Sequence, residues 1–210
     1  MPRKRRIWYP GAQYHIMCRG NHRAEIYREE EDRQVYLSLL EETRKKYPFS
    51  LISYCLMSNH VHLQIETIDT EPGIFMKMLN MKYAIYFNKK YNFVGYLFQG
   101  RYRSELIESD AHLLQTSKYI HLNPVRASIV EKPAMYEWSS YREYLNELSL
   151  QSKVKYCPVV LNTGVILRYF KNNSAELYKA YVEYELSLYN PSKNTDDAVS
   201  AHAGSAGEDG

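Results

Sequence analysis

A strand-like segment carries two histidines that could bind a metal ion. Side chains alternate between the two faces of a strand, so His60 and His62 share one polar face. The intervening and following residues Val61, Leu63 and Ile65 form an apolar face that can pack on helices. Two imidazoles at this spacing can bind one divalent ion. The same spacing also occurs where histidines only pack, so the pair alone leaves both roles open.

A tyrosine and an asparagine lie one turn apart in a predicted helix. Tyr119 and Asn123 therefore share one helix face. A tyrosine hydroxyl has a pKa of about 10 and is a weak nucleophile, but beside a metal-bound phosphate it can attack phosphorus and form a phosphotyrosine. The amide oxygen of Asn123 could complete the metal shell. The alternative is that Tyr119 only packs and that Asn123 ends the helix before Pro124.

Basic residues flank these candidates in the sequence. The net charge is only +3, but residues 1–28 hold seven arginines and lysines against one glutamate. Such a segment can bind a polyanion such as DNA, and the alternative is a solvated arm that aids solubility. Arginines near the tyrosine helix and the first strand could hold phosphates or read guanine edges. The candidate DNA-binding residues are Arg3, Lys4, Arg5, Arg6, Arg19, Arg23, Arg101, Arg103 and Arg126.

Composition narrows the class of protein. Of the 210 residues, 45% are apolar, which is enough for a folded core. We find no run of about 18 apolar residues, and no apolar region follows the basic start, so neither a membrane helix nor a secretory signal is predicted. Three cysteines without a CxxC pair are expected to be reduced thiols of a cytoplasmic protein. The sequence has no Gly-x-Ser-x-Gly elbow, Walker loop or adjacent cysteine–histidine pair as a rival site.

The elements that position these residues follow from hydrophobic periodicity and from helix and turn signals. We predict strands over 12–19, 49–57 and 60–67 and within 95–108, and helices over 29–47, 73–91 and from the N-cap Ser109 to about Leu122. This is the split βαβ order of an α+β, ferredoxin-like antiparallel sheet with helices on one face. The other face would be open for a site, and the helix carrying Tyr119 would follow the last core strand.

Several stretches of the sequence also form a joint pattern. They are Tyr54–Leu63 and Tyr119–Ala127, with support from residues 14–21, 98–102 and 138–141. Together they resemble the REP-associated tyrosine transposases, a branch of the single-tyrosine HUH transposases. The resemblance covers about residues 8–145 and implies an HUH transposase/endonuclease domain over 1–145. We further expect a helical C-terminal extension over 146–190 and a disordered tail over 191–210.

The resemblance implies a role for each candidate residue. Tyr119 matches the nucleophile, His60 and His62 match the ligands of Mg²⁺ or Mn²⁺, and Asn123 matches a third ligand that is typically Gln in the insertion-sequence branch. The implied protein is a bacterial, cytoplasmic endonuclease and strand transferase. It would cut and rejoin single-stranded DNA beside imperfect hairpins, at a site marked by a tetranucleotide, through a 5′-phosphotyrosine and without ATP. A monomer is favoured over a dimer.

Two other functions remain as alternatives. A non-catalytic, domesticated DNA-hairpin-binding protein would keep the fold, but it would need no nucleophile, and Tyr119, His60 and His62 are all present. A replication-initiator or conjugative nuclease of the wider HUH class is disfavoured because the chain has no helicase. A covalent protein–DNA adduct formed with hairpin DNA and Mn²⁺ would distinguish the enzyme from the binding protein.

Overall fold

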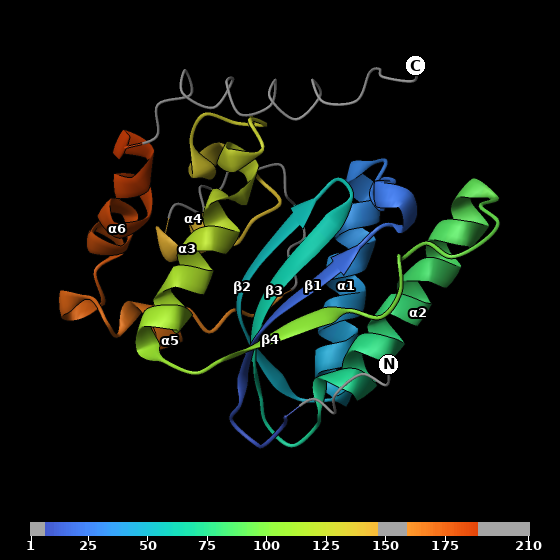
Figure 1. Cartoon of the computed structure of the whole chain (residues 1–210), viewed down its shortest axis with the longest axis horizontal. Coiled ribbons are helices and arrows are strands. Elements are labelled where there is room, and N and C mark those ends of the chain that lie inside the picture. Colours follow the sequence, from blue (N-terminus) through green and yellow to red (C-terminus); the bar gives the residue numbers. More distant parts are fainter. Residues whose placement is uncertain (1–6, 147–158, 189–210) are drawn as a thin grey trace, which may run out of the picture.

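The computed structural model describes residues 7–146 and 159–188. Four antiparallel strands form one sheet in the order β2-β3-β1-β4 (Figure 1). The strands are β1 (Gln13–Arg19), β2 (Phe49–Met57), β3 (His60–Thr67) and β4 (Arg103–Ile107). Helices α1 (Glu30–Lys46) and α2 (Pro72–Tyr91) make the two crossovers between them. The predicted α+β, ferredoxin-like arrangement is therefore confirmed, and β2 and β3 have their predicted bounds.

The remaining elements follow β4. They are α3 (Asp110–Arg126), α4 (Tyr141–Tyr144), α5 (Gly164–Leu167) and α6 (Ala175–Leu188), with 3₁₀ turns at Pro133–Met135 and Lys171–Asn173. A further 3₁₀ turn, Asn21–Arg23, lies between β1 and α1. In the described part of the chain, no helix is both long and apolar enough to cross a bilayer. Cys18 and Cys55 are buried free thiols, whereas Cys157 lies outside the described residues.

Helices α1 and α2 cover one face of the sheet and form the main core with it. Alternation along the strands places Tyr14 and Ile16 of β1 and Leu63 of β3 on this face, where all three are buried. They belong to one apolar cluster with Leu40 of α1 and Phe75 of α2. Burial of this face provides the main hydrophobic stabilisation of the domain.

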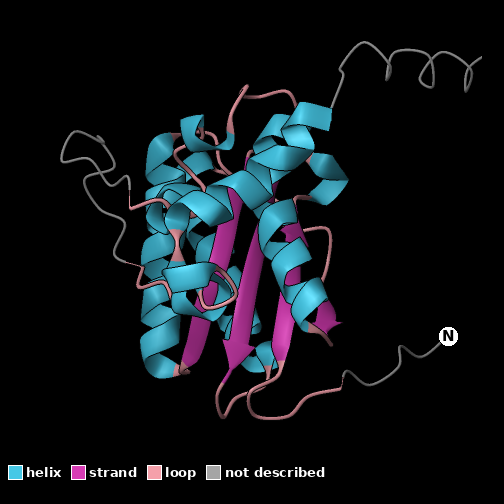
Figure 2. Cartoon of the chain, turned by 90° about the vertical axis from the view of Figure 1, so that its left-hand side faces the viewer, coloured by secondary structure: helices cyan, strands magenta, loops and turns pink. Residues whose placement is uncertain are grey.

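The opposite face of the sheet is not left open, which corrects the prediction from the sequence. Helix α3 packs on β2 and β3, and helices lie in front of part of the sheet when it is viewed from this side (Figure 2). The Gln64 side-chain amide of β3 donates a 2.9 Å hydrogen bond to the carbonyl of Leu113 on α3. The polar strand face is therefore buried at Gln64 and His62, while β1 and β4 border a cavity beside α3.

Helix α3 continues past the position where Pro124 was predicted to end it. Pro124 lies inside the helix, which runs to Arg126, and the backbone N–H of Ala127 still donates to the carbonyl of Asn123 at 3.0 Å. A proline removes one intrahelical hydrogen bond, but Leu122, Asn123 and Pro124 are all buried. Tertiary packing of this last turn outweighs the local preference, so Asn123 lies within the helix.

A buried polar network joins α3 to the C-terminal residues and to the sheet. The Tyr178 hydroxyl of α6 lies 2.6 Å from Ser117 Oγ and 2.7 Å from His121 Nδ1. His121 Nε2 lies 2.8 Å from Ser140 Oγ, which also accepts the backbone N–H of Tyr54 on β2 at 2.9 Å. Burial lowers the pKa of His121 to about 3, so its neutral ring offers one donor and one acceptor nitrogen to two hydroxyls. These contacts fix the orientation of α3.

Replacing Tyr178 by phenylalanine tests this network. Tyr178→Phe keeps the ring but removes the hydroxyl shared by Ser117 and His121, so we expect the free energy of unfolding to fall by about 1–3 kcal/mol in urea titrations. Tyr184→Phe on the same helix is the matched control, because Tyr184 is 67% exposed, and it should change stability by less than about 0.5 kcal/mol. Equal losses in the two variants would show that the network does not stabilise the protein.

Candidate metal and nucleophile site

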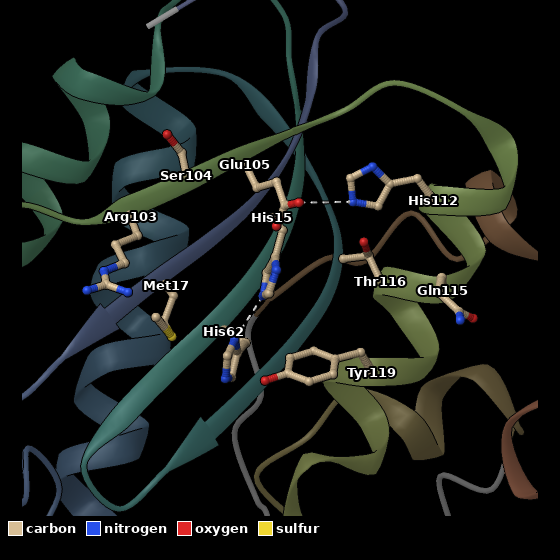
Figure 3. Close-up of a pocket in the computed structure, with 10 residues that line it drawn as sticks. All are labelled: His15, Met17, His62, Arg103, Ser104, Glu105, His112, Gln115, Thr116 and Tyr119. Carbon is tan, nitrogen blue, oxygen red and sulfur yellow. Dashed lines mark hydrogen bonds and ion pairs between the residues drawn. The ribbon is translucent and has the colours of Figure 1, made fainter. Parts of the chain in front are cut away.

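Two histidines of β3 and a tyrosine of α3 meet beside the sheet. The ring centroids of His60 and His62 are 4.9 Å apart, and those of His62 and Tyr119 are 5.5 Å apart with the rings nearly perpendicular. The Tyr119 hydroxyl points toward His62 (Figure 3). Tyr119 is 39% exposed although much of the same helix is buried. The two predicted metal ligands and the predicted nucleophile are therefore neighbours.

Asn123 lies close to the first of these histidines. It is buried, and its side chain makes a hydrogen bond to His60. Tyr119 and Asn123 are one turn apart on α3, so a single helix presents both to β3. The structure thus brings His60, His62, Tyr119 and Asn123 together, in agreement with their predicted grouping. Their chemical roles stay predictions.

Both histidines are held through the same ring nitrogen. His62 Nδ1 lies 2.9 Å from His15 Nε2, and His60 Nδ1 lies 2.6 Å from the side-chain oxygen of Asn59. Asn59 belongs to the tight turn between β2 and β3. Each imidazole therefore has Nε2 as the atom that could coordinate an ion, while Nδ1 holds the ring in place.

The histidines are neutral near pH 7, the state in which imidazole binds metals. Burial, with smaller effects from the neighbouring imidazoles and from Arg19, lowers the pKa of His62 to about 2. Burial also lowers the pKa of His60 and of His15 below the usual histidine value.

The three candidate ligands His60, His62 and Asn123 fit a divalent ion that would also bind the phosphate of a substrate. Within residues 7–146 and 159–188, no group of three histidine, cysteine or acidic side chains could hold a metal. Two imidazoles and the amide oxygen of Asn123 would form an incomplete shell around such an ion and would leave positions for phosphate oxygens. The amide oxygen of Asn123 and phosphate oxygens are ligands that suit Mg²⁺ and Mn²⁺, while the two neutral imidazoles can ligate first-row divalent metals.

A cavity of about 560 Å³ adjoins the tyrosine, and the ten residues labelled in Figure 3 line it. They come from β1, β3, β4 and α3. A second cavity of about 200 Å³ is lined by Arg19, Arg101 and Arg103 together with Met17. Met17 and Arg103 line both cavities, so the two cavities are adjacent. The arginine-lined cavity therefore lies next to the one that contains Tyr119.

The other predicted DNA-binding residues lie in different surroundings. The guanidinium of Arg126 lies 5.1 Å from the centroid of the Tyr119 ring, in cation–π geometry. The backbone carbonyl of Arg23 accepts a hydrogen bond from Asn59, so this residue supports the turn before β3. Residues 3–6, which carry the predicted basic arm, lie outside the described residues.

Sequence reasoning missed His15. In β1, the alternation that buries Tyr14 and Ile16 in the core places His15 on the opposite face. That position was available from the sequence, but its partner was not, because it depends on the pairing of β1 with β3. His112 of α3 and Glu105 of β4 were also missed, and His112 Nε2 lies 3.7 Å from a carboxylate oxygen of Glu105 across the cavity.

Comparison with known proteins identifies the family. The model of the IS200-like transposases matches residues 9–123, which include His60, His62, Tyr119 and Asn123. The chain belongs to the IS200-like transposase family. Of the predicted DNA-binding residues, Arg126 and residues 3–6 lie outside the range that this model matches.

Two of the similar proteins are named as REP-associated tyrosine transposases. A Haemophilus influenzae protein named as a REP-associated tyrosine transposase is 26% identical over 118 residues, covering 50% of this chain and 66% of its own length. This match thus spans slightly less than two thirds of that relative. The solved structure of a REP-associated tyrosine transposase bound to a REP hairpin has 13% identity and a TM-score of 0.59, and it covers 78% of this chain and 93% of its own. The predicted resemblance is confirmed.

Proposed function

We propose that this IS200-like transposase is a metal-dependent endonuclease and strand transferase for single-stranded DNA, with Tyr119 as its nucleophile. The observation that carries the proposal is the Tyr119 hydroxyl pointing toward His62 within a group that also holds His60 and Asn123. A pure binding protein needs no such arrangement. The substrate is proposed to be DNA with imperfect hairpins, because the similar solved protein is bound to a REP hairpin.

The proposed reaction proceeds by two transfers at phosphorus. Mg²⁺ or Mn²⁺ held by His60, His62 and Asn123 would polarise a non-bridging oxygen of the scissile phosphate. The Tyr119 hydroxyl loses its proton to solvent and its oxygen attacks phosphorus. The bond between phosphorus and the 3′-oxygen breaks, and the departing oxygen takes a proton from solvent to become a 3′-hydroxyl. A second 3′-hydroxyl then attacks the 5′-phosphotyrosine and releases Tyr119. The ester linkage is preserved throughout, so no ATP is needed.

Other residues of the chain would hold the DNA near the cut. The guanidinium of Arg126 lies over the Tyr119 ring, where it can meet the charge of the scissile phosphate. Arg19, Arg101 and Arg103 line the neighbouring cavity and would bind the phosphates that follow. Because β3 and α3 of one chain supply the whole group, a monomer is proposed as the active form.

Removing one hydroxyl tests the nucleophile. Tyr119→Phe should reduce hairpin cleavage to a trace while hairpin affinity stays within a few fold, since no charge and almost no packing area change. Cleavage is measured on labelled hairpin oligonucleotides with Mn²⁺. Tyr96→Phe is the control, because Tyr96 is 85% exposed and lies outside the group, and it should cut at the wild-type rate. Substantial cleavage by Tyr119→Phe would assign the nucleophile to another tyrosine.

Removing either imidazole tests the metal ligands. His60→Ala and His62→Ala should each weaken Mn²⁺ binding and abolish metal-dependent cleavage, because one missing ligand leaves too few protein donors. Calorimetric titration with Mn²⁺ measures the affinity directly, and His112→Ala serves as a histidine control from the same cavity. Unaltered Mn²⁺ binding by the double variant would place the metal elsewhere.

Salt dependence separates phosphate contacts from sequence reading. Deleting residues 1–6 should weaken binding to matched and scrambled hairpins equally and flatten the dependence on salt. Arg101→Ala, Arg103→Ala or Arg126→Ala should reduce cleavage more, and a lost guanine contact would reduce discrimination by about 1–3 kcal/mol. Titrations at two salt concentrations distinguish these effects, with Arg168→Ala as a control on the distant α5 cap. If deleting residues 1–6 alone removed the preference for the matched hairpin, this segment, and not the three arginines, would read the DNA sequence.

A further inference from the structure

The cavity beside Tyr119 contains a third histidine that belongs neither to the predicted ligands nor to the predicted DNA contacts. His15 of β1 lies with its Nε2 atom 2.9 Å from Nδ1 of His62. The two rings are stacked, with centroids 5.1 Å apart and an interplanar angle of 26°. The ring centroids of His15 and Tyr119 are 5.8 Å apart, with an interplanar angle of 68°. Figure 3 shows His15 next to His62, with a dashed line that marks the hydrogen bond between them.

A hydrogen bond between two neutral imidazoles contains one proton, which can belong to either ring. If His15 donates, the only proton of neutral His62 is on Nε2, and that nitrogen cannot bind a metal. If His62 donates through Nδ1, its Nε2 atom carries a free lone pair. The direction of this one hydrogen bond therefore decides whether His62 can be a ligand.

We propose that His15 is a positioning residue that accepts the Nδ1 proton of His62 and thereby presents His62 Nε2 to the divalent ion. This inference rests on the proposed function, since it assumes that His62 binds the metal. Donation of the second ring proton of a ligating histidine to a neighbouring acceptor is a general way to fix its tautomer and its orientation. Here the acceptor is an imidazole on the adjacent strand.

The neighbours of His15 support this direction of the hydrogen bond. When His15 Nε2 accepts, the proton of neutral His15 must be on Nδ1. Glu105 lies opposite His15 in the pairing of β1 with β4, so a carboxylate that can accept this Nδ1 proton lies on the neighbouring strand. The stacked contact also prevents rotation of the His62 ring. His15 itself is not assigned as a ligand, because its Nε2 atom is engaged by His62.

The decisive experiment is a calorimetric Mn²⁺ titration in the Tyr119→Phe background, where no cleavage occurs. His15→Phe keeps a ring of similar size without an acceptor, and it should weaken Mn²⁺ binding about 10–100-fold. His15→Gln should restore binding to within a few fold of the parent, because the Gln Oε1 atom can occupy the position of His15 Nε2. His112→Phe is the matched control, a histidine of the same cavity without a contact to His62, and it should bind as the parent does.

Two further measurements keep the result interpretable. Thermal unfolding without metal should differ little among the variants, and if His15→Phe does not fold, His15→Leu replaces it. Pulsed electron paramagnetic resonance of bound Mn²⁺ counts coordinated imidazoles, and we expect two in the parent and two in His15→Gln.

Three results would overturn the inference, and they are distinguishable. Parent-like Mn²⁺ affinity in folded His15→Phe would show that His15 does not position His62, even if His62→Ala still abolishes binding. Three imidazoles on the ion in the parent, reduced to two in His15→Gln, would make His15 a ligand. A parent that binds no Mn²⁺ would overturn the metal-dependent function and this inference together.

Discussion

The structure depends on helix α3 keeping a single rotation against the polar face of the sheet. Rotation by one residue, about 100° on an α-helix, would turn Tyr119 away from His62 and bury a different side chain. The hydrogen bond from Gln64 to the Leu113 carbonyl and the buried contacts of Tyr178 oppose this rotation. A buried hydrogen-bond donor or acceptor that loses its partner lowers the stability of the folded state, whereas the same group in water would bond to solvent. The buried polar contacts below α3 therefore fix the rotation of this helix, and with it the position of Tyr119 at the candidate site.

Strand alternation divides the sheet into a face that stabilises the fold and a face that carries the candidate site residues. Apolar side chains of β1 and β3 pack under α1 and α2, while His15 and His62 from the same strands meet on the other side. Antiparallel strands hold the imidazoles of His15, His60 and His62, and a packed helix presents Tyr119, so none of these four candidate residues lies on a loop. Such a scaffold keeps reacting groups in place before the DNA arrives. The arginines, in contrast, lie on exposed or partly exposed positions, where they can follow a nucleic acid strand.

Local periodicity was enough to predict the six core elements and the two pairs His60–His62 and Tyr119–Asn123, because each pair shares a face within one element. The grouping of the two pairs into one site followed only from the family resemblance. Periodicity could not predict that α3 covers β2 and β3, or that burial of the turn around Pro124 carries the helix to Arg126. Those outcomes depend on tertiary packing, which overrides local preference. His15 was missed because its contact crosses between strands, and Tyr178 could not be singled out among 21 tyrosines.

The central claim is that Tyr119 and the two histidines of β3 form one metal-dependent cleavage site. Mass spectrometric mapping of the covalent protein–DNA adduct tests it most directly. The wild-type chain is incubated with hairpin oligonucleotides taken from repeated palindromes near its gene, with Mn²⁺ or with EDTA, and is then digested with trypsin. We predict a nucleotide remnant on the peptide that contains Tyr119 in the Mn²⁺ sample and none in the EDTA sample. A remnant on a different tyrosine, or an equal yield with EDTA, would contradict the account.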